Sequence, residues 1–233
     1  MKIAIMQPYV FPYIGYFQLI AAVDIFVFYD DVNFIKRGWI NRNRILLNGK
    51  EKLVTFPCIE ASQNKLINEV AVNLKEKQYG KLKMTIEQSY KKAPHFLSVF
   101  PLIEEVLNSE VNTIARLATK SVQLFANYIG IKTSFYESSE EFNETKGLEK
   151  ADRLIAIAKK MNIKHYINAI GGKELYDKKY FKNQGVQLNF LKPGIEPYYQ
   201  SNEKFVPGLS IIDVLMFNDK EKVKELLTNY TLV

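Results

Sequence analysis

The sequence contains little cysteine or histidine and no long apolar run. Among 233 residues there is one cysteine, Cys58, and there are two histidines. A single cysteine excludes an internal disulfide framework and fits a reducing compartment. Its setting, Thr-Phe-Pro-Cys-Ile, is typical of a buried strand end, which favours a structural role over a nucleophilic one. Because no stretch approaches the roughly 18 apolar residues of a membrane span and no signal-peptide pattern is visible, we expect a cytoplasmic protein.

Several signatures of catalysis and of nucleic-acid binding are also absent. The sequence has no Walker glycine loop, no zinc-ligand spacing and no serine-histidine-aspartate order with elbow glycines. A net charge of +7 could serve a nucleic acid, a membrane or a phosphorylated small molecule. Many lysines fall in 74–92 and 177–182 at helical spacing, which is typical of a solvated face. We therefore expect no nucleic-acid partner, and we assign no metal.

The first thirty residues predict a parallel pair of strands. Lys2–Met6 is a short apolar run that ends at Gln-Pro, and Ile25–Tyr29 is a second run that ends at two aspartates. Between them, Tyr16–Val23 has apolar residues at helical spacing. A strand, a helix and a strand in this order form a right-handed crossover, so the two strands are expected to be parallel.

The remaining pattern predicts one α/β domain, 1–233, with a mainly parallel, Rossmann-like sheet flanked by helices. Asn48-Gly49 predicts a tight hairpin turn within Arg44–Pro57. Helices are predicted over about 74–92 and 99–129, so that 74–129 forms a mostly helical insertion in the domain. Further strands are predicted at 131–136, 164–168 and 185–191, with a polar linker at 138–141 and helices at 150–161 and from Ser210. Ser210 and Asp213 favour a variant capping box over a catalytic pair.

Ligands of such sheets bind beyond the carboxyl ends of the strands, which is where the polar residues concentrate. Gln7 follows the first predicted strand, and Asp30 and Asp31 follow the second. One of these aspartates is the predicted catalytic base or acceptor for a sugar hydroxyl, since adjacent carboxylates on an extended chain point opposite ways. Two alternatives are ion pairs with Lys36 and Arg37, and a divalent cation.

A ligand with a polar ring and a phosphate suits the residues around these strand ends. Arginine forks match phosphate oxygens, and tyrosine and tryptophan rings stack on flat ligands. Glycine turns can direct backbone amides at an anion. The predicted substrate-binding residues are therefore Gln7, Tyr9, Tyr16, Lys36, Arg37, Trp39, Asn41, Arg42, Arg44, Gly171 and Gly172.

Three stretches resemble the WbqC-like family, whose members are commonly encoded in bacterial O-antigen and capsule gene clusters. The first is Met6-Gln-Pro-Tyr-Val-Phe-Pro-Tyr-Ile-Gly-Tyr-Phe-Gln-Leu-Ile, with Tyr29-Asp-Asp-Val and Lys36-Arg-Gly-Trp-Ile-Asn-Arg-Asn-Arg behind it. The others are Gly171-Gly172 with Tyr176, and Leu209-Ser-Ile-Ile-Asp-Val-Leu. The resemblance implies modification of a nucleotide-linked sugar.

The first turn is also similar, more distantly, to that of nucleotidyltransferases that carry a His-x-Gly-His sequence. Here Tyr13 and Tyr16 stand at the two histidine positions. Tyrosine supplies no cation at neutral pH to stabilise a pentavalent phosphorus, which argues against ordinary adenylyl transfer.

The predicted function is N-acyl or aminoacyl transfer to a nucleotide-linked amino sugar in O-antigen or capsule biosynthesis. Arg42→Ala is expected to raise KM for the nucleotide sugar. The acyl donor and cofactor stay open among coenzyme A, a carrier protein, an aminoacyl carrier and ATP plus an acid. The alternatives are an ATP-dependent ligase or nucleotidyltransferase-like enzyme, and a non-catalytic nucleotide-sugar-binding protein. Oligomerisation is possible.

Overall fold

A six-stranded sheet forms the centre of the computed structural model, which describes residues 1–201 and 204–233. Its strand order is β5-β2-β1-β6-β7-β8. The strands are β1 (Lys2–Met6), β2 (Ile25–Phe28), β5 (Ser134–Glu137), β6 (His165–Ala169), β7 (Gln187–Pro193) and β8 (Tyr230–Leu232). All neighbours are parallel except β7 and β8. The predicted fold class, a mainly parallel sheet flanked by helices, is confirmed.

The predicted crossover at the N-terminus is present. Helix α1 (Ile14–Ala21) connects β1 to β2, and the two strands are parallel over four residue pairs, from Ile3 beside Ile25 to Met6 beside Phe28. The next strand in the chain beyond the helical region, β5, extends the sheet outside β2. β6 then pairs with the other edge of β1, so the direction of strand addition reverses between β1 and β6.

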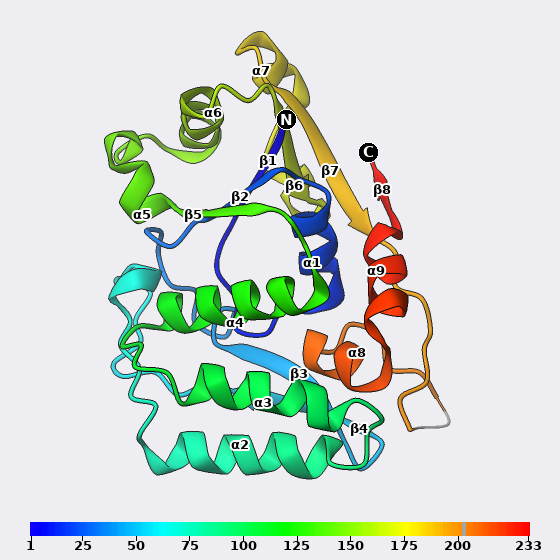
Figure 1. Cartoon of the computed structure of the whole chain (residues 1–233). Coiled ribbons are helices and arrows are strands. Elements are labelled where there is room, and N and C mark those ends of the chain that lie inside the picture. The colour runs from blue at the N-terminus through cyan, green and yellow to red at the C-terminus, as the bar shows by residue number, and fades with distance from the viewer. Residues whose placement is uncertain (202–203) are drawn as a thin grey trace.

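Helices cover the two faces of this sheet (Figure 1). One face carries α1, α4 (Ile114–Ile129) and α9 (Lys220–Thr228), and the other carries α6 (Lys150–Lys160) and α7 (Lys178–Asn183). Since successive side chains of a strand point to opposite faces, β1 serves two separate cores. Ala4 lies in the core under α1 and α4, whereas Ile3 and Ile5 lie in the core under α6 and α7.

The helices of the region 74–129 are stacked side by side, with α4 nearest the sheet and α2 (Lys77–Tyr90) farthest from it (Figure 1). The third is α3 (Phe96–Leu107). The single helix expected over 99–129 is wrong, because the chain leaves helical geometry at Asn108. A new helix begins at Thr113, whose hydroxyl accepts a hydrogen bond from the Arg116 amide at 3.3 Å. Its expected end is confirmed at Gly130, which has a left-handed φ of 92°.

The predicted hairpin consists of β3 (Arg42–Leu47) and β4 (Lys50–Thr55). Asn48 and Gly49 connect the strands with φ angles of 51° and 73°. Two consecutive positive φ angles define the primed turn that Asn-Gly favours. The hairpin begins at Arg42, two residues before the expected start, so Arg42 and Arg44 both belong to β3.

Other elements depart from the predicted pattern. Residues expected as a polar linker form the short helix α5 (Ser138–Glu141), and β8 adds an antiparallel edge that was not predicted. Ser210 caps α8 (Ile211–Phe217), but the Asp213 carboxylate accepts hydrogen bonds from the Tyr90 and Tyr198 hydroxyls instead of completing a capping box. The remaining turns are η1 (Ile67–Glu69), η2 (Asn143–Thr145) and η3 (Ile170–Glu174). In residues 1–201 and 204–233, no helix combines the length and apolar character needed to cross a membrane.

Candidate functional site

A cavity of about 390 Å³ lies at the carboxyl ends of β1 and β6. This is the point where the strand order reverses, the usual ligand position in open parallel sheets. The volume falls within the range of small-molecule sites. The cavity is lined by Met6, Tyr9, Pro12, Tyr13, Trp39, Asn43, Arg44, Ala169, Ile170, Gly171, Ile195 and Gly208.

The loop between β1 and α1 forms one wall and is fixed by side chains from distant parts of the chain. The Ser121 hydroxyl of α4 accepts a hydrogen bond from the Phe11 amide at 3.0 Å. The Ser210 hydroxyl donates to the Phe11 carbonyl at 2.7 Å, and the Asn43 amide donates to the Val10 carbonyl at 3.3 Å. These contacts satisfy the loop's backbone groups, so Tyr9 and Tyr13 project from a pre-formed support.

Three aromatic side chains line the cavity. The Tyr9 ring packs on the buried Tyr16 ring with centroids 5.5 Å apart. Tyr13 lies over Gly15, where an added Cβ would come within 2.5 Å of the tyrosine ring, so this ring position requires glycine. Trp39 is the third ring, with 46% of its surface exposed. Burial, and secondarily the neighbouring Tyr13, raises the pKa of Tyr9 to about 12, so its ring is neutral at physiological pH.

Among the described residues that line the cavity, Arg44 is the one cation. Its guanidinium lies 5.5 Å from the centre of the Trp39 ring and forms an ion pair with Glu51 at 2.9 Å. A further nitrogen donates to the Gly208 carbonyl at 3.0 Å, and the buried Nε has no hydrogen-bond partner among the described residues. Arg44 is thus held in place and keeps an unused donor.

The predicted glycine turn contributes one glycine to the cavity and one to the fold. Gly171 lies on η3, directly after β6, and lines the cavity. Gly172 is buried, and a Cβ there would come within 2.7 Å of the Asn168 side chain. Close packing therefore accounts for Gly172, whereas Gly171 faces open space.

The structure brings Tyr9, Trp39, Arg44 and Gly171 together at the cavity. The other predicted binding residues do not line it. They are Gln7, Tyr16, Lys36, Arg37, Asn41, Arg42 and Gly172.

The contacts of three of these residues show what else they do. The Tyr16 hydroxyl donates to the Gln7 carbonyl at 2.9 Å. The buried Asn41 amide donates to the Phe56 carbonyl at 2.9 Å, and Arg42 Nε donates to the Gly38 carbonyl at 3.0 Å. Lys36 and Arg37 lie exposed on the turn that Gly38 closes. Tyr16, Asn41 and Arg42 therefore support the segments that carry Tyr9 and Trp39.

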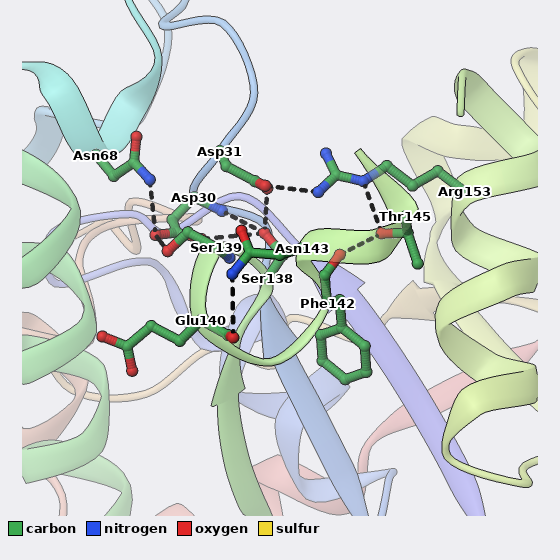
Figure 2. Close-up of polar contacts among 10 residues, drawn as sticks. All are labelled: Asp30, Asp31, Asn68, Ser138, Ser139, Glu140, Phe142, Asn143, Thr145 and Arg153. Carbon is green, nitrogen blue, oxygen red and sulfur yellow. Dashed lines mark hydrogen bonds and ion pairs between the residues drawn. The ribbon is translucent and has the colours of Figure 1, made fainter. Parts of the chain in front are cut away.

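Asp30 lies at the end of β2 in a network of hydrogen bonds (Figure 2). Its Oδ1 accepts from the Ser138 hydroxyl and the Ser139 amide, both at 3.0 Å. Its Oδ2 accepts from the Ser139 hydroxyl at 2.6 Å and from the Asn68 amide at 3.4 Å. These four donors occupy both carboxylate oxygens of a side chain that is buried and does not line the cavity.

Asp31 forms a buried ion pair with Arg153 of α6 at 2.6 Å (Figure 2). Its carboxylate also accepts a hydrogen bond from Ser138, the hydroxyl that contacts Asp30. Arg153 in turn donates to the Thr145 hydroxyl at 3.2 Å and lies over the Tyr29 ring. Burial lowers the pKa of Arg153, but the hydrogen bonds and charges of Asp31 and Tyr29 together outweigh it and raise this pKa, so the guanidinium stays charged. The cation is thus Arg153, instead of the Lys36 or Arg37 of the ion-pair alternative.

Residues that sequence reasoning did not select complete the site. Tyr13, Asn43 and Gly208 line the cavity, and Gly208 gives room to Arg44, whose Nη2 would lie 2.9 Å from an added Cβ. The Pro-Tyr-Ile-Gly order around Tyr13 was the available signal, because glycine two residues later makes space for the ring. Ile195 and Gly208 lie between β7 and α8, and the described residues around them belong to no helix or strand, so the sequence gives no comparable signal.

The remaining candidate groups are a thiol and metal ligands. Burial raises the pKa of the Cys58 thiol to about 12, which keeps it protonated near neutral pH and disfavours a nucleophilic role. Across residues 1–201 and 204–233, no three histidine, cysteine or acidic side chains gather in a way that could hold a metal ion.

Comparisons of the sequence with known proteins identify a family that the chain matches. The model of the WbqC-like protein family matches residues 7–225. An uncharacterized protein of Mycobacterium tuberculosis, Rv1507c, is similar at 27% identity over 220 residues, which is 93% of each chain. No solved structure matches the chain.

Proposed function

The chain belongs to the WbqC-like protein family, and we propose that it transfers an acyl or aminoacyl group to a nucleotide-linked amino sugar in O-antigen or capsule biosynthesis. The observation that carries the proposal is the lining of the cavity where the strand order reverses. Three aromatic rings and one arginine gather there, with no carboxylate among the described residues that line it. Such a lining suits a flat ring and an anionic group on one ligand.

Each part of the ligand has a proposed partner. Trp39 is exposed enough to stack on a base without unfolding the core, and Tyr9 and Tyr13 offer rings and hydroxyl groups to a base or sugar. Arg44 contributes positive charge to the cavity wall. The supported loop before α1 holds the tyrosines in place before the ligand arrives, which lowers the entropic cost of binding.

In the proposed transfer, the amine nitrogen of the sugar attacks the acyl carbonyl carbon. The new amide bond forms, the bond to the donor's leaving group breaks with its electron pair, and the amine proton goes to a base. Asp30 or Asp31 remains the proposed base. Neither carboxylate lines the cavity, Asp30 has four hydrogen-bond donors around it and Asp31 is paired with Arg153. The amine would therefore have to reach past the cavity wall, and the carboxylate would have to exchange one of these contacts for it.

A second candidate is a nucleotide-sugar-binding protein without turnover. One observation favours it: the described residues that line the cavity include no aspartate, glutamate, histidine, lysine or cysteine. Turnover with any acyl donor would exclude this candidate.

A thermal-shift screen tests the binding part of the proposal. The protein is heated with UDP-, GDP- and dTDP-linked sugars, with coenzyme A, and with ATP and magnesium. A ligand at 100 times its Kd adds about 2.7 kcal/mol of stability. A shift with a nucleotide sugar that Trp39→Ala removes supports the proposal and selects substrates for amide-formation assays. A shift with ATP and magnesium alone would favour the ligase alternative, and no shift with any nucleotide would contradict the proposal.

A further inference from the structure

A second cavity of about 540 Å³ adjoins the first. It is lined by Ile170, Gly171, Lys173, Glu174, Lys192 and Val233. Ile170 and Gly171 line both cavities, so the η3 turn after β6 forms their common border. A Cβ added at Gly171 would have no atom within 4 Å, so the border is open where this side chain would stand.

The second cavity adds two lysines to the arginine that lines the first cavity. Lys173 lies on η3, and Lys192 lies on β7, where it pairs with Thr231 of β8. Both lysines are exposed, and neither ammonium group has an ion-pair or hydrogen-bond partner within the part of the chain that the structure describes. The carboxylate of Glu174 is likewise without such a partner there, so the described lining of this cavity has two ammonium groups and one carboxylate.

The negative charge of a nucleotide sugar's diphosphate requires nearby cations. A diphosphate carries two negative charges at least, whereas the first cavity offers Arg44, which is already paired with Glu51. Lys36, Arg37 and Arg42, the cations predicted from the sequence to hold it, do not line the first cavity. Lys173 and Lys192 are cations that line the second cavity, which shares Gly171 with the first.

We propose that the second cavity binds the phosphate groups of a ligand whose ring occupies the first cavity or meets it at Gly171. The inference rests on the proposed function of the first cavity. The phosphates belong either to the diphosphate of the nucleotide sugar or to a phosphate-bearing acyl donor such as coenzyme A. In both cases Lys173 and Lys192 supply charge, and the missing side chain at Gly171 lets the ligand pass from one cavity to the other.

Calorimetric titration of matched ligands tests the assignment. Uridine, guanosine and thymidine, their 5′-diphosphates and coenzyme A are titrated into the wild type and the double variant Lys173→Gln/Lys192→Gln. We expect the diphosphates to lose about tenfold in affinity for each lysine removed, while nucleoside affinity stays unchanged. A loss confined to coenzyme A would also support the phosphate site and would assign it to the acyl donor.

Two further variants separate this site from general charge effects. Gly171→Leu fills the border and is expected to weaken the diphosphates more than the nucleosides, without a change in Tm. The control Lys77→Gln/Lys81→Gln removes the same charge from exposed positions on α2 and is expected to bind like the wild type.

The two proposals fail in different ways. One result would overturn the proposed phosphate site in the second cavity but not the proposed function. In it, Lys173→Gln/Lys192→Gln binds all phosphate ligands with wild-type affinity, while Trp39→Ala loses nucleoside binding. Equal losses in the α2 control would also overturn it, since the effect would then be one of net charge. If the wild type binds none of these ligands, the proposed function fails and the second cavity's role fails with it.

Discussion

The polar residues that follow β1 and those that follow β2 end neighbouring parallel strands, yet they are used differently. After β1, rings and Arg44 line a cavity, and Arg44 keeps a buried donor without a partner. After β2, Asp30 and Asp31 are buried among serine hydroxyls, amides and Arg153. Groups already satisfied within the protein stabilise the fold, whereas side chains that border a cavity can contact a ligand. The comparison therefore favours ligand binding at the end of β1. At the end of β2 it favours a stabilising role for Asp30 and Asp31, beside the proposed role of one of them as base.

The largest effect is expected from Asp31→Asn. The change leaves the Arg153 guanidinium buried without its counter-charge, because both side chains are almost fully covered. We expect the free energy of unfolding to fall by about 3 kcal/mol. Tm should fall by roughly 6 to 12 °C for a chain of this size, measured by calorimetry.

Glu104→Gln is the matched control, since it makes the corresponding change in the partly exposed ion pair with Lys83. It should leave Tm unchanged. If Asp31→Asn keeps the wild-type Tm but loses turnover, Asp31 is the base that the sequence predicted and the structural reading of the β2 end is wrong.

The second effect concerns the rings at the β1 end. Trp39→Ala removes a stacking surface and should weaken nucleotide-sugar binding by about 2 kcal/mol, or roughly 30-fold in Kd. Tm without ligand should not change, since the side chain is half exposed. Leu97→Ala on α3, another exposed apolar side chain, should bind like the wild type. Equal affinity in Trp39→Ala would remove this ring from the site.

A smaller effect should distinguish two arginines of the same strand. Arg44→Gln is expected to weaken nucleotide-sugar binding by about tenfold, because this guanidinium lines the cavity. Arg42→Gln should change Kd by less than about twofold, because its side chain contacts the Gly38 carbonyl outside the cavity. Direct titration of both variants measures this difference. A larger loss in Arg42→Gln would restore the prediction made from the sequence and contradict the cavity geometry.

The smallest effect is a pH dependence at Tyr9. Its pKa is raised from 10.0 to about 12, first by burial and then by Tyr13. The folded protein therefore keeps this proton longer than the unfolded chain does, so the stabilisation is complete below pH 10 and is lost as pH rises towards 12. Denaturant unfolding across this range should show a smaller loss of stability in Tyr9→Phe than in the wild type. An identical loss would mean that Tyr9 is not buried as described.

The sequence predicted the local elements well where one physical rule decides them. Asn48-Gly49 specifies its turn, Gly130 ends its helix, and the alternation of strands and helices gives the parallel sheet. It failed where a choice depends on distant partners. β8, for example, is defined by its pairing with β7. The break between α3 and α4 is a different kind of miss, because its Thr113 cap is a local signal.

The site shows the same division. Tyr9, Trp39, Arg44 and Gly171 follow from residue type and from the rule that ligands bind at the carboxyl ends of strands. Lys36 and Arg37 have suitable chemistry as well, but an exposed turn carries them away from the cavity. The partner of Asp31 lies 122 residues further along the chain, and no local pattern points to it.

The most direct test of the central claim uses the fact that the chain has a single tryptophan, Trp39, and that it lines the cavity. Titration with nucleotide-linked sugars should change its fluorescence saturably, with the same Kd as calorimetry gives, because a stacked base quenches the indole. Binding by calorimetry without any change in tryptophan emission would place the ligand elsewhere and contradict the account.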